Sequence, residues 1–136
     1  MKYSTEISTS HSMDALLTLL SDPSFVLPKI FKSIKKIETT NSSFSGTASY
    51  LGLTHEINGN VFRSVNKVSY VFILRHGKDT GSGNLNFIIS NNKVDIIFEY
   101  EGWMEKLSQS IIIKWIKEFC RNFEEDIRIE RIRRKL

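Results

Sequence analysis

The sequence has a single cysteine, two prolines and no long apolar run. Because Cys120 is the only thiol among the 136 residues, no internal disulfide can form, which is typical of a reducing cytoplasm. No stretch approaches the roughly 18 uninterrupted apolar residues of a membrane span. The N-terminus has no apolar segment behind Lys2, so it does not resemble a secretory signal. We therefore expect a cytoplasmic protein without integral membrane association.

Glutamine and alanine are also scarce. Glutamine occurs once and alanine twice. Scarce glutamine is typical of proteins from thermophilic organisms, although codon bias gives the same composition. The remaining composition, 40% hydrophobic and 25% charged residues, is ordinary for a globular protein. A net charge of +4 permits an acidic partner without demanding one. A chain of 136 residues is long enough to bury one hydrophobic core, so we expect a single domain over residues 1–136.

Motifs for metal binding, phosphate binding and nucleophilic catalysis are missing. The three histidines and Cys120 lack the spacing of metal ligands, and no nucleophile elbow occurs. The glycines at 77, 81 and 83 fit neither phosphate-binding pattern, so they indicate a flexible hairpin loop that could serve as a pocket lid. We expect no metal or cofactor, and we assign no catalytic residue.

The first thirty residues predict a strand followed by two short helices. Residues 3–9 alternate in polarity, as in a strand. Ser10 or Ser12 can then cap a helix whose apolar stripe begins at Met13. Asp22 can cap a second helix that starts at Pro23, and Pro28 limits it to about two turns.

From residue 33 to residue 101 the apolar period is two, and turn residues interrupt it. The breaks fall at 40–42, near Gly52, at 58–60, at 77–83 and at 91–92. Strict alternation indicates one wet and one buried face, so we predict an antiparallel meander of about six strands. Asn58-Gly59 fits either a two-residue hairpin or a bulge.

After Gly102 the period becomes helical. An apolar arc from Met104 to Ile127 predicts one helix of about 25 residues, roughly 38 Å long. The arc is broad, so the helix must be covered on more than one side. Beyond Asp126 the pattern fails, and we expect the basic end, residues 131–135, to overhang the body in solvent.

The order of elements predicts an α+β fold: strand, two helices, six strands and a long helix. A curved antiparallel sheet of about six to seven strands would wrap around the C-terminal helix. A single helix set against so many strands leaves space that side chains alone do not fill.

Several segments carry a resemblance to a known superfamily. They are the helix-breaking stretch from Asp22 to Pro28, the strand-like Ser33–Glu38 segment and Gly102-Trp103 at the start of the last helix. The chain resembles the helix-grip superfamily of START domains, the birch-pollen allergen (Bet v 1-like) fold and polyketide cyclases. More narrowly, it is similar to a small crenarchaeal, thermophile-restricted family of uncharacterised domains. The resemblance implies a cavity for a hydrophobic ligand and carries over no active-site residue.

We expect the ligand between the inner face of the sheet and the last helix. Aromatic rings would line it, with tyrosine hydroxyls as polar handles. His55 shares strand parity with Ile57; a core or rim role is favoured over catalysis. Arg63 and Arg75 could anchor a carboxylate at the mouth, although surface positions are the default. The candidate ligand-binding residues are Tyr50, His55, Ile57, Tyr70, Phe72, Phe87, Phe98, Tyr100, Ile112, Trp115 and Phe119.

The leading hypothesis is binding of a lipid-like or aromatic small molecule by a monomer or weak homodimer. One alternative is a cyclase- or hydrolase-like enzyme that uses His55, Tyr50 or Tyr100 as acid or base. Another is a protein-partner module that uses the overhanging helix end, which deletion of residues 129–136 would test. No nucleic-acid partner is expected, because acidic residues dilute the basic tail and no RNA-binding aromatic motif accompanies it.

Overall fold

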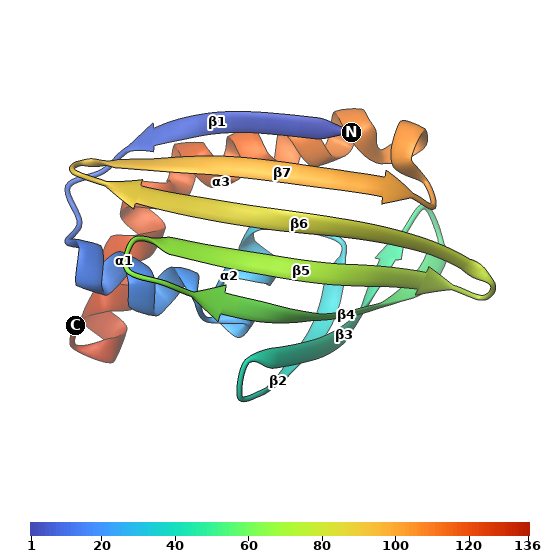
Figure 1. Ribbon diagram of the computed structural model, residues 1–136, viewed down its shortest axis with the longest axis horizontal. Coiled ribbons are helices and arrows are strands. Elements are labelled where there is room, and N and C mark those ends of the chain that lie inside the picture. Colours follow the sequence, from blue (N-terminus) through green and yellow to red (C-terminus); the bar gives the residue numbers. More distant parts are fainter.

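The computed structural model describes residues 1–136 and contains seven strands and three helices (Figure 1). None of the helices is long and apolar enough to traverse a bilayer. The elements in chain order are β1 (Lys2–Ser8), α1 (Met13–Leu20), α2 (Pro23–Ile30), β2 (Ile34–Thr40), β3 (Ser43–Tyr50), β4 (Leu53–Arg63), β5 (Lys67–His76), β6 (Asp79–Ser90), β7 (Lys93–Gly102) and α3 (Glu105–Arg134).

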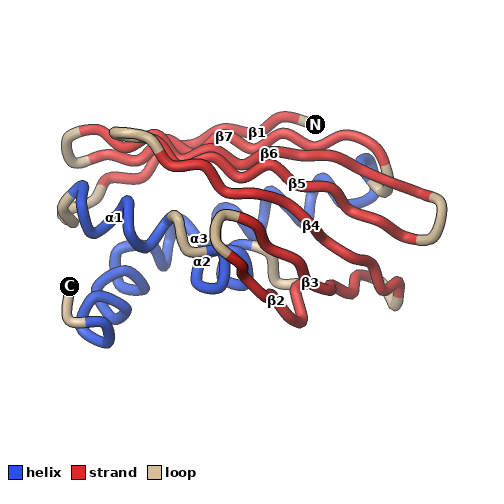
Figure 2. The backbone as a smooth tube through the Cα atoms, turned by 60° about the horizontal axis from the view of Figure 1, so that its bottom comes forward, coloured by secondary structure: helices blue, strands red, loops and turns tan.

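All seven strands form one antiparallel sheet in the order β1-β7-β6-β5-β4-β3-β2. The meander runs from β2 to β7, and β1 closes the far edge by pairing with β7. The sheet curves, and the three helices lie on its concave side (Figure 2). This confirms the predicted α+β fold, with a curved sheet around a long C-terminal helix.

The alternating residues of the strands bury one face of the sheet, as the period of two predicts. Leu85, Phe87 and Ile89 on β6 are at most 1% exposed. Full burial of each such side chain stabilises the fold by roughly 1.5–3 kcal/mol. Tyr70 on β5 also donates its hydroxyl to the Leu20 carbonyl of α1, 2.6 Å away, so the sheet and the first helix are joined at the core.

The two short helices begin at the predicted caps. The Ser12 side chain accepts a hydrogen bond from the Ala15 amide at the start of α1. Asp22 caps α2 by accepting from the Ser24 amide, and Pro23 occupies the first helical position. Pro28 lies inside α2, which ends at Ile30.

Asn58 and Gly59 form neither a hairpin nor a bulge, because β4 continues through them in regular register with β3 and β5. A Cβ atom on Gly59 would lie 2.2 Å from the Val71 carbonyl oxygen and 2.7 Å from Cζ of Phe44. Gly59 therefore allows the Phe44 ring to pack closely on the strand. Glycine occurs in strands for this reason as well as at turns, and the sequence alone does not distinguish the two.

The predicted flexible loop at 77–83 is also wrong. The β5–β6 turn consists of Gly77 and Lys78, and β6 starts at Asp79. Gly81 and Gly83 lie inside β6, where the rings of Tyr100 and Phe72 cover them. These glycines make room for aromatic rings, and no lid is present at this position.

The C-terminal end of α3 is docked through Glu130, Arg131 and Arg134, which corrects in part the prediction that it overhangs in solvent; Ile132, Arg133 and Lys135 are exposed as expected. Glu130 is only 7% exposed, and it accepts hydrogen bonds from Nε of Arg133 at 2.9 Å and Nε of Arg134 at 2.6 Å. The hydrogen bond from Arg133, helped by Arg134, lowers the pKa of Glu130 to about 2.

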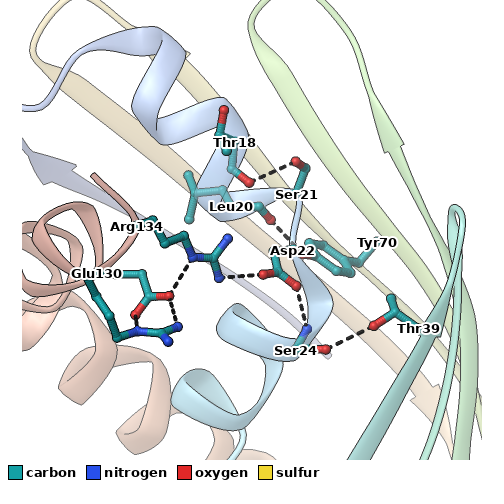
Figure 3. A network of polar contacts seen from close by, with 10 residues as sticks. Thr18, Leu20, Ser21, Asp22, Ser24, Thr39, Tyr70, Glu130 and Arg134 are labelled. Atoms are coloured by element: carbon teal, nitrogen blue, oxygen red, sulfur yellow. Dashed lines mark hydrogen bonds and ion pairs between the residues drawn. The ribbon is translucent and has the colours of Figure 1, made fainter. Parts of the chain in front are cut away.

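Two arginines tie this helix end to the rest of the fold. Arg134 donates to Asp22 at 2.6 Å, so one guanidinium joins α3 to the cap of α2 (Figure 3). A guanidinium nitrogen of Arg131 lies 3.1 Å from Nδ1 of His11. The apolar pattern fails here because paired charges, rather than carbon, occupy the buried face.

We predict that Arg134→Gln destabilises the protein more than Arg128→Gln. Arg134 connects two elements and is 29% exposed, whereas Arg128 is 55% exposed and pairs with Glu125 of the same helix. We expect losses of about 1 kcal/mol for Arg134→Gln and under about 0.5 kcal/mol for Arg128→Gln in chemical denaturation. Equal losses would contradict the docking role of Arg134.

We predict that Gly59→Ala costs about 1–3 kcal/mol, because the added methyl group must displace strand backbone and the Phe44 ring. Asn58→Ala is the matched control, since Asn58 is exposed on the same strand; its expected change is within about 0.5 kcal/mol. Urea denaturation measures both, and a neutral Gly59→Ala variant would refute the packing argument.

Candidate functional site

A cavity of about 70 Å³ lies between the sheet and the N-terminal half of α3. Fourteen of its seventeen lining residues are hydrophobic, and they come from the sheet, the end of α2 and the first three turns of α3. The lining consists of Phe31, Ser33, Ile34, Ala48, Tyr50, His55, Ile57, Phe72, Leu74, Phe98, Tyr100, Trp103, Met104, Ser108, Ile111, Ile112 and Trp115.

Eight of the eleven predicted site residues lie in this lining. They are Tyr50, His55, Ile57, Phe72, Phe98, Tyr100, Ile112 and Trp115. The other three, Tyr70, Phe87 and Phe119, lie in the packed core, where Phe87 stands 6.3 Å from both other rings. The predicted residues all lie on the inner face of the sheet or on α3. The sequence did not indicate that the cavity lies only under the first three turns of α3.

Phe31, which sequence reasoning missed, divides the cavity from the filled part of the core. This residue is the C-cap of α2, and its ring lies 6.3 Å from that of Phe72 and 5.6 Å from that of Phe98. Phe31 lies three residues after Pro28. Because α2 ends at Ile30, the Phe31 ring can turn into the interior. The only sequence signal near Phe31 was Pro28, which predicted the end of a helix and not a residue that lines a cavity.

The sheet side of the cavity is a stack of aromatic rings. Phe72 is nearly parallel to Phe98, at 22°, and to Tyr100, at 11°, with centroids 6.3 and 6.4 Å apart. The Tyr100 hydroxyl donates to the Trp103 carbonyl at 2.5 Å, and burial raises its pKa to about 12. This wall is flat and apolar, and its only hydroxyl is already engaged.

The cavity is closed on the sheet side and opens between β3 and α3. Ala48, Phe72 and Phe98 are at most 4% exposed, whereas Tyr50 and Trp115 are half-buried. The rings of Tyr50 and Trp115 meet edge to face with centroids 6.2 Å apart. Tyr50 and Trp115 thus lie at one half-buried edge of the cavity, which we take as its mouth; Ile34, Leu74, Trp103, Met104 and Ile111 are half-buried as well.

His55 is the main polar group on the inner lining. It is 7% exposed, and its Nδ1 lies 3.4 Å from the Leu53 carbonyl oxygen. Trp103 lies between two imidazoles, 5.0 Å from His55 edge to face and 4.8 Å from His76 in a parallel stack. Burial is the largest cause of a lowered His55 pKa, with His76 adding to it. The ring is therefore neutral at pH 7, and because Nδ1–H donates to the Leu53 carbonyl, Nε2 is left to accept one hydrogen bond.

The other polar side chains near the cavity differ in whether they are already hydrogen-bonded. The Ser108 hydroxyl donates to the Met104 carbonyl at 2.7 Å, whereas the Tyr50 hydroxyl has no protein partner. Arg63 and Arg75 are exposed and do not line the cavity. No group of three or more His, Cys, Asp or Glu side chains could hold a metal ion.

Of the lining residues that the prediction omitted, several had a sequence signal. Ile111 and Met104 belong to the predicted apolar arc of the helix, and Trp103 follows the glycine at the helix junction. Ile34, Ala48 and Leu74 lie on strands whose alternation was visible, and Ser33 directly precedes β2. Their inclusion depends on where the helix crosses the sheet, which periodicity does not specify.

Comparison with known proteins identifies the family. A model of a family of uncharacterised Sulfolobus proteins matches residues 1–136. The chain belongs to this family. A hypothetical protein from Sulfolobus tokodaii, solved by crystallography, shares 25% identity over 98% of this chain and 99% of its own, with a TM-score of 0.83. This agrees with the crenarchaeal family predicted from sequence.

More distant structures share the fold alone. A conserved protein from Geobacillus kaustophilus has a TM-score of 0.67 at 11% identity and covers 93% of each chain. A Thermus thermophilus protein has a TM-score of 0.58 at 13% identity over 96% of this chain and 97% of its own. Among curated protein sequences there is no significant match.

We predict that His55 makes stability pH-dependent below neutrality. Its pKa is lowered in the folded state, so the unfolded chain takes up a proton more readily as pH falls. The free energy of unfolding should therefore be highest above the ordinary histidine value of about 6.5 and fall toward the folded-state pKa.

The measurement is urea denaturation of wild type and His55→Gln at pH 8, 6.5 and 5. The difference between the two proteins isolates the contribution of this ring from that of other titrating groups. The wild type should lose more stability than the variant as pH falls. An identical pH dependence would show that His55 is not desolvated.

Proposed function

We propose that the protein binds a small apolar ligand with an aromatic or lipid-like body and a single polar group. The observation that carries the proposal is the apolar cavity under the first turns of α3, with its half-buried mouth at Tyr50 and Trp115. The curved sheet around one long helix resembles the arrangement of the helix-grip superfamily. This resemblance supports membership of that superfamily and implies a cavity for a hydrophobic ligand.

The shape and chemistry of the lining define the class of ligand. The stacked wall of Phe72, Phe98 and Tyr100 offers flat carbon surface to a ring or an alkyl chain. His55 offers a neutral imidazole whose Nε2 can accept a hydrogen bond from a hydroxyl or a protonated carboxyl group. A few placed polar groups in an apolar lining are the usual composition of small-molecule sites.

The volume sets the size of a ligand that fits without rearrangement. An engineered apolar cavity of about 150 Å³ holds benzene, and drug-sized sites span about 300–1,000 Å³. At about 70 Å³ the cavity takes only part of such a molecule. A larger ligand must therefore extend through the mouth or part Tyr50 from Trp115, whose contact is a single edge-to-face pair.

The expected affinity is moderate. A ligand that buries about 200–300 Å² of apolar surface gains several kcal/mol at about 25 cal/mol per Å², before ordering costs. A micromolar dissociation constant needs about 8.2 kcal/mol, so apolar burial alone gives weaker binding, with dissociation constants of about 0.1–1 mM, and the hydrogen bond to His55 has to supply any further affinity.

An enzyme on the same scaffold has weaker support. His55 is a neutral, buried imidazole in the cavity, as an acid–base residue would be. However, its only hydrogen-bond partner is a carbonyl at 3.4 Å, no carboxylate lines the cavity, and the Tyr100 hydroxyl is engaged. Nothing orients a proton transfer, so the geometry supports binding better than catalysis.

A partner module built on the C-terminal end of α3 is also less well supported. Glu130 and Arg134, which such a module would present, pair with each other and with Asp22. Deletion of residues 129–136 would therefore destabilise the fold, so loss of association after that deletion would not identify a partner surface.

We predict that Ala48→Val reduces ligand binding without reducing stability. Ala48 is 2% exposed and lines the cavity, so added methyl groups fill empty space and stabilise by about 0.5–2 kcal/mol. Fluorescence titration with naphthalene-based probes and fatty acids, together with their effect on Tm, measures binding.

Phe87→Leu is the opposite control. Phe87 is fully buried away from the cavity, so the variant should lose about 1 kcal/mol of stability yet keep its affinity for the probes. Failure of every apolar probe to bind wild type, or equal binding by wild type and Ala48→Val, would overturn the proposed function.

A further inference from the structure

The two edge strands of the sheet differ in how far they are protected from pairing with another chain. Proteins protect an edge with charges, a bulge, a proline or a covering element, because its free backbone groups pair readily with another strand. β2 has a register shift between Ile34 and Lys36. β1 pairs with β7 alone, without a register shift, and contains neither proline nor glycine (Figure 1). The only protection that β1 has is its charges.

Alternate backbone groups of β1 point away from the sheet. At the two ends of the strand, the Met1 carbonyl and the Thr9 amide form hydrogen bonds of 3.0 Å with β7 and with the turn before it. Bonding alternates along an antiparallel strand, so the odd-numbered residues face β7. The amide and carbonyl groups of Lys2, Ser4 and Glu6 therefore point outward, where the chain offers them no partner.

A second copy of β1 matches this edge in one antiparallel register. Outward-facing residues must oppose outward-facing residues, so the two-fold axis passes through a residue and not between two. An axis at Ser4 sets Lys2 of each copy opposite Glu6 of the other. An axis at either neighbouring residue sets Lys2 opposite a serine instead. The charges of β1 thus favour the register centred on Ser4.

The charges on β7 extend this match. Lys2 lies 4.0 Å from Glu99, and Glu6 lies 3.4 Å from Lys93. With the axis at Ser4, one row of alternating sign would cross the two copies on the outer face of the sheet. Its members are Glu99 and Lys2 of one copy, followed by Glu6 and Lys93 of the other. Asp95, 3.8 Å from Lys93, adds a negative charge at the end of the row.

The side of α3 beneath β1 runs parallel to the strand. Glu105 contacts the Met1 amine near the start of the helix, and Glu124 accepts a hydrogen bond from the Thr9 hydroxyl at 2.7 Å. The helical and the strand segments between these two contacts both span about 26–29 Å. Ile113 therefore lies level with the middle of β1, where the axis passes.

Ile113 offers apolar surface at this point. It is half-buried and lies eleven residues before Glu124, which places it on the same face of the helix. In a dimer about the Ser4 axis, the two copies of Ile113 face each other. The same side of α3 also carries the exposed Lys106 and Lys117, and the axis brings Lys106 of one copy near the level of Lys117 of the other. Their long side chains can turn to solvent, so they weaken the contact without blocking it.

We propose that two copies of this protein pair through β1, in antiparallel register about Ser4, and form one continuous sheet. A second copy fits this edge because it supplies both a strand with matching backbone groups and the opposite charges at the matching positions. One strand and one side of a helix bury less than roughly 1,200 Å², so the association is weak and reversible. The cavity opens between β3 and α3, away from β1, so the proposal does not depend on ligand binding.

The test is sedimentation velocity of the purified full chain over a wide concentration range. We expect a reversible dimer of the wild type. Lys2→Glu and Glu6→Lys should each weaken association about tenfold, because each sets like charges opposite each other. An equimolar mixture of the two variants should restore it, since the mixed dimer regains both opposite-charge contacts. Lys36→Glu is the matched control, because Lys36 is an equally exposed lysine on the other edge strand and should associate as wild type does.

Each outcome decides the proposal. A wild type that stays monomeric at about 500 µM, or equal association by wild type and Lys2→Glu, overturns it. Loss of the dimer in Lys36→Glu but not in Lys2→Glu would assign the contact to β2 and also overturn it. Failure of the mixture to associate, with both variants folded by circular dichroism, would contradict the register. Recovery in the mixture alone confirms that Lys2 faces Glu6 of the other copy.

Discussion

Packing of α3 across the concave face of the sheet determines both the stability of this protein and the position of its cavity. The C-terminal half of the helix meets a second layer, in which α1 and α2 lie beside it and Phe119 and Phe123 enter the core. The N-terminal half meets only the sheet. A straight helix against a curved sheet leaves empty space wherever no other element fills it. Phe31 lies between the packed core under the C-terminal half of α3 and the cavity under its N-terminal half.

The fold could be predicted in most respects because its two periodicities are clear. Alternation along β5, β6 and β7 identified the buried face, and the helical arc from Met104 to Ile127 identified α3. Two errors have a common cause. Gly59 was interpreted as part of a hairpin or a bulge and Gly81 as part of a flexible loop, but each gives space to an aromatic ring that is distant in sequence. A local pattern cannot distinguish these two uses of glycine.

The same limit applies to the site and to the helix end. Alternation separates inner from outer faces, so it selected Tyr70 and Phe72 equally, although only Phe72 borders empty space. Which ring meets the cavity depends on where α2 ends and α3 crosses the sheet. The helix end was expected in solvent because the apolar pattern fails beyond Asp126, yet Arg133 and Arg134 pair with the buried Glu130. Tertiary pairing of this kind leaves no periodic signal.

A crystal structure with a small apolar probe tests the central claim most directly. Crystals of the wild-type protein would be pressurised with xenon, which enters dry apolar cavities. The account predicts density for the probe between Ala48, Phe72 and Ile112, with no density near Phe87 and Phe119. A cavity filled by its own side chains, or an occupied site elsewhere in the core with this one empty, would contradict it.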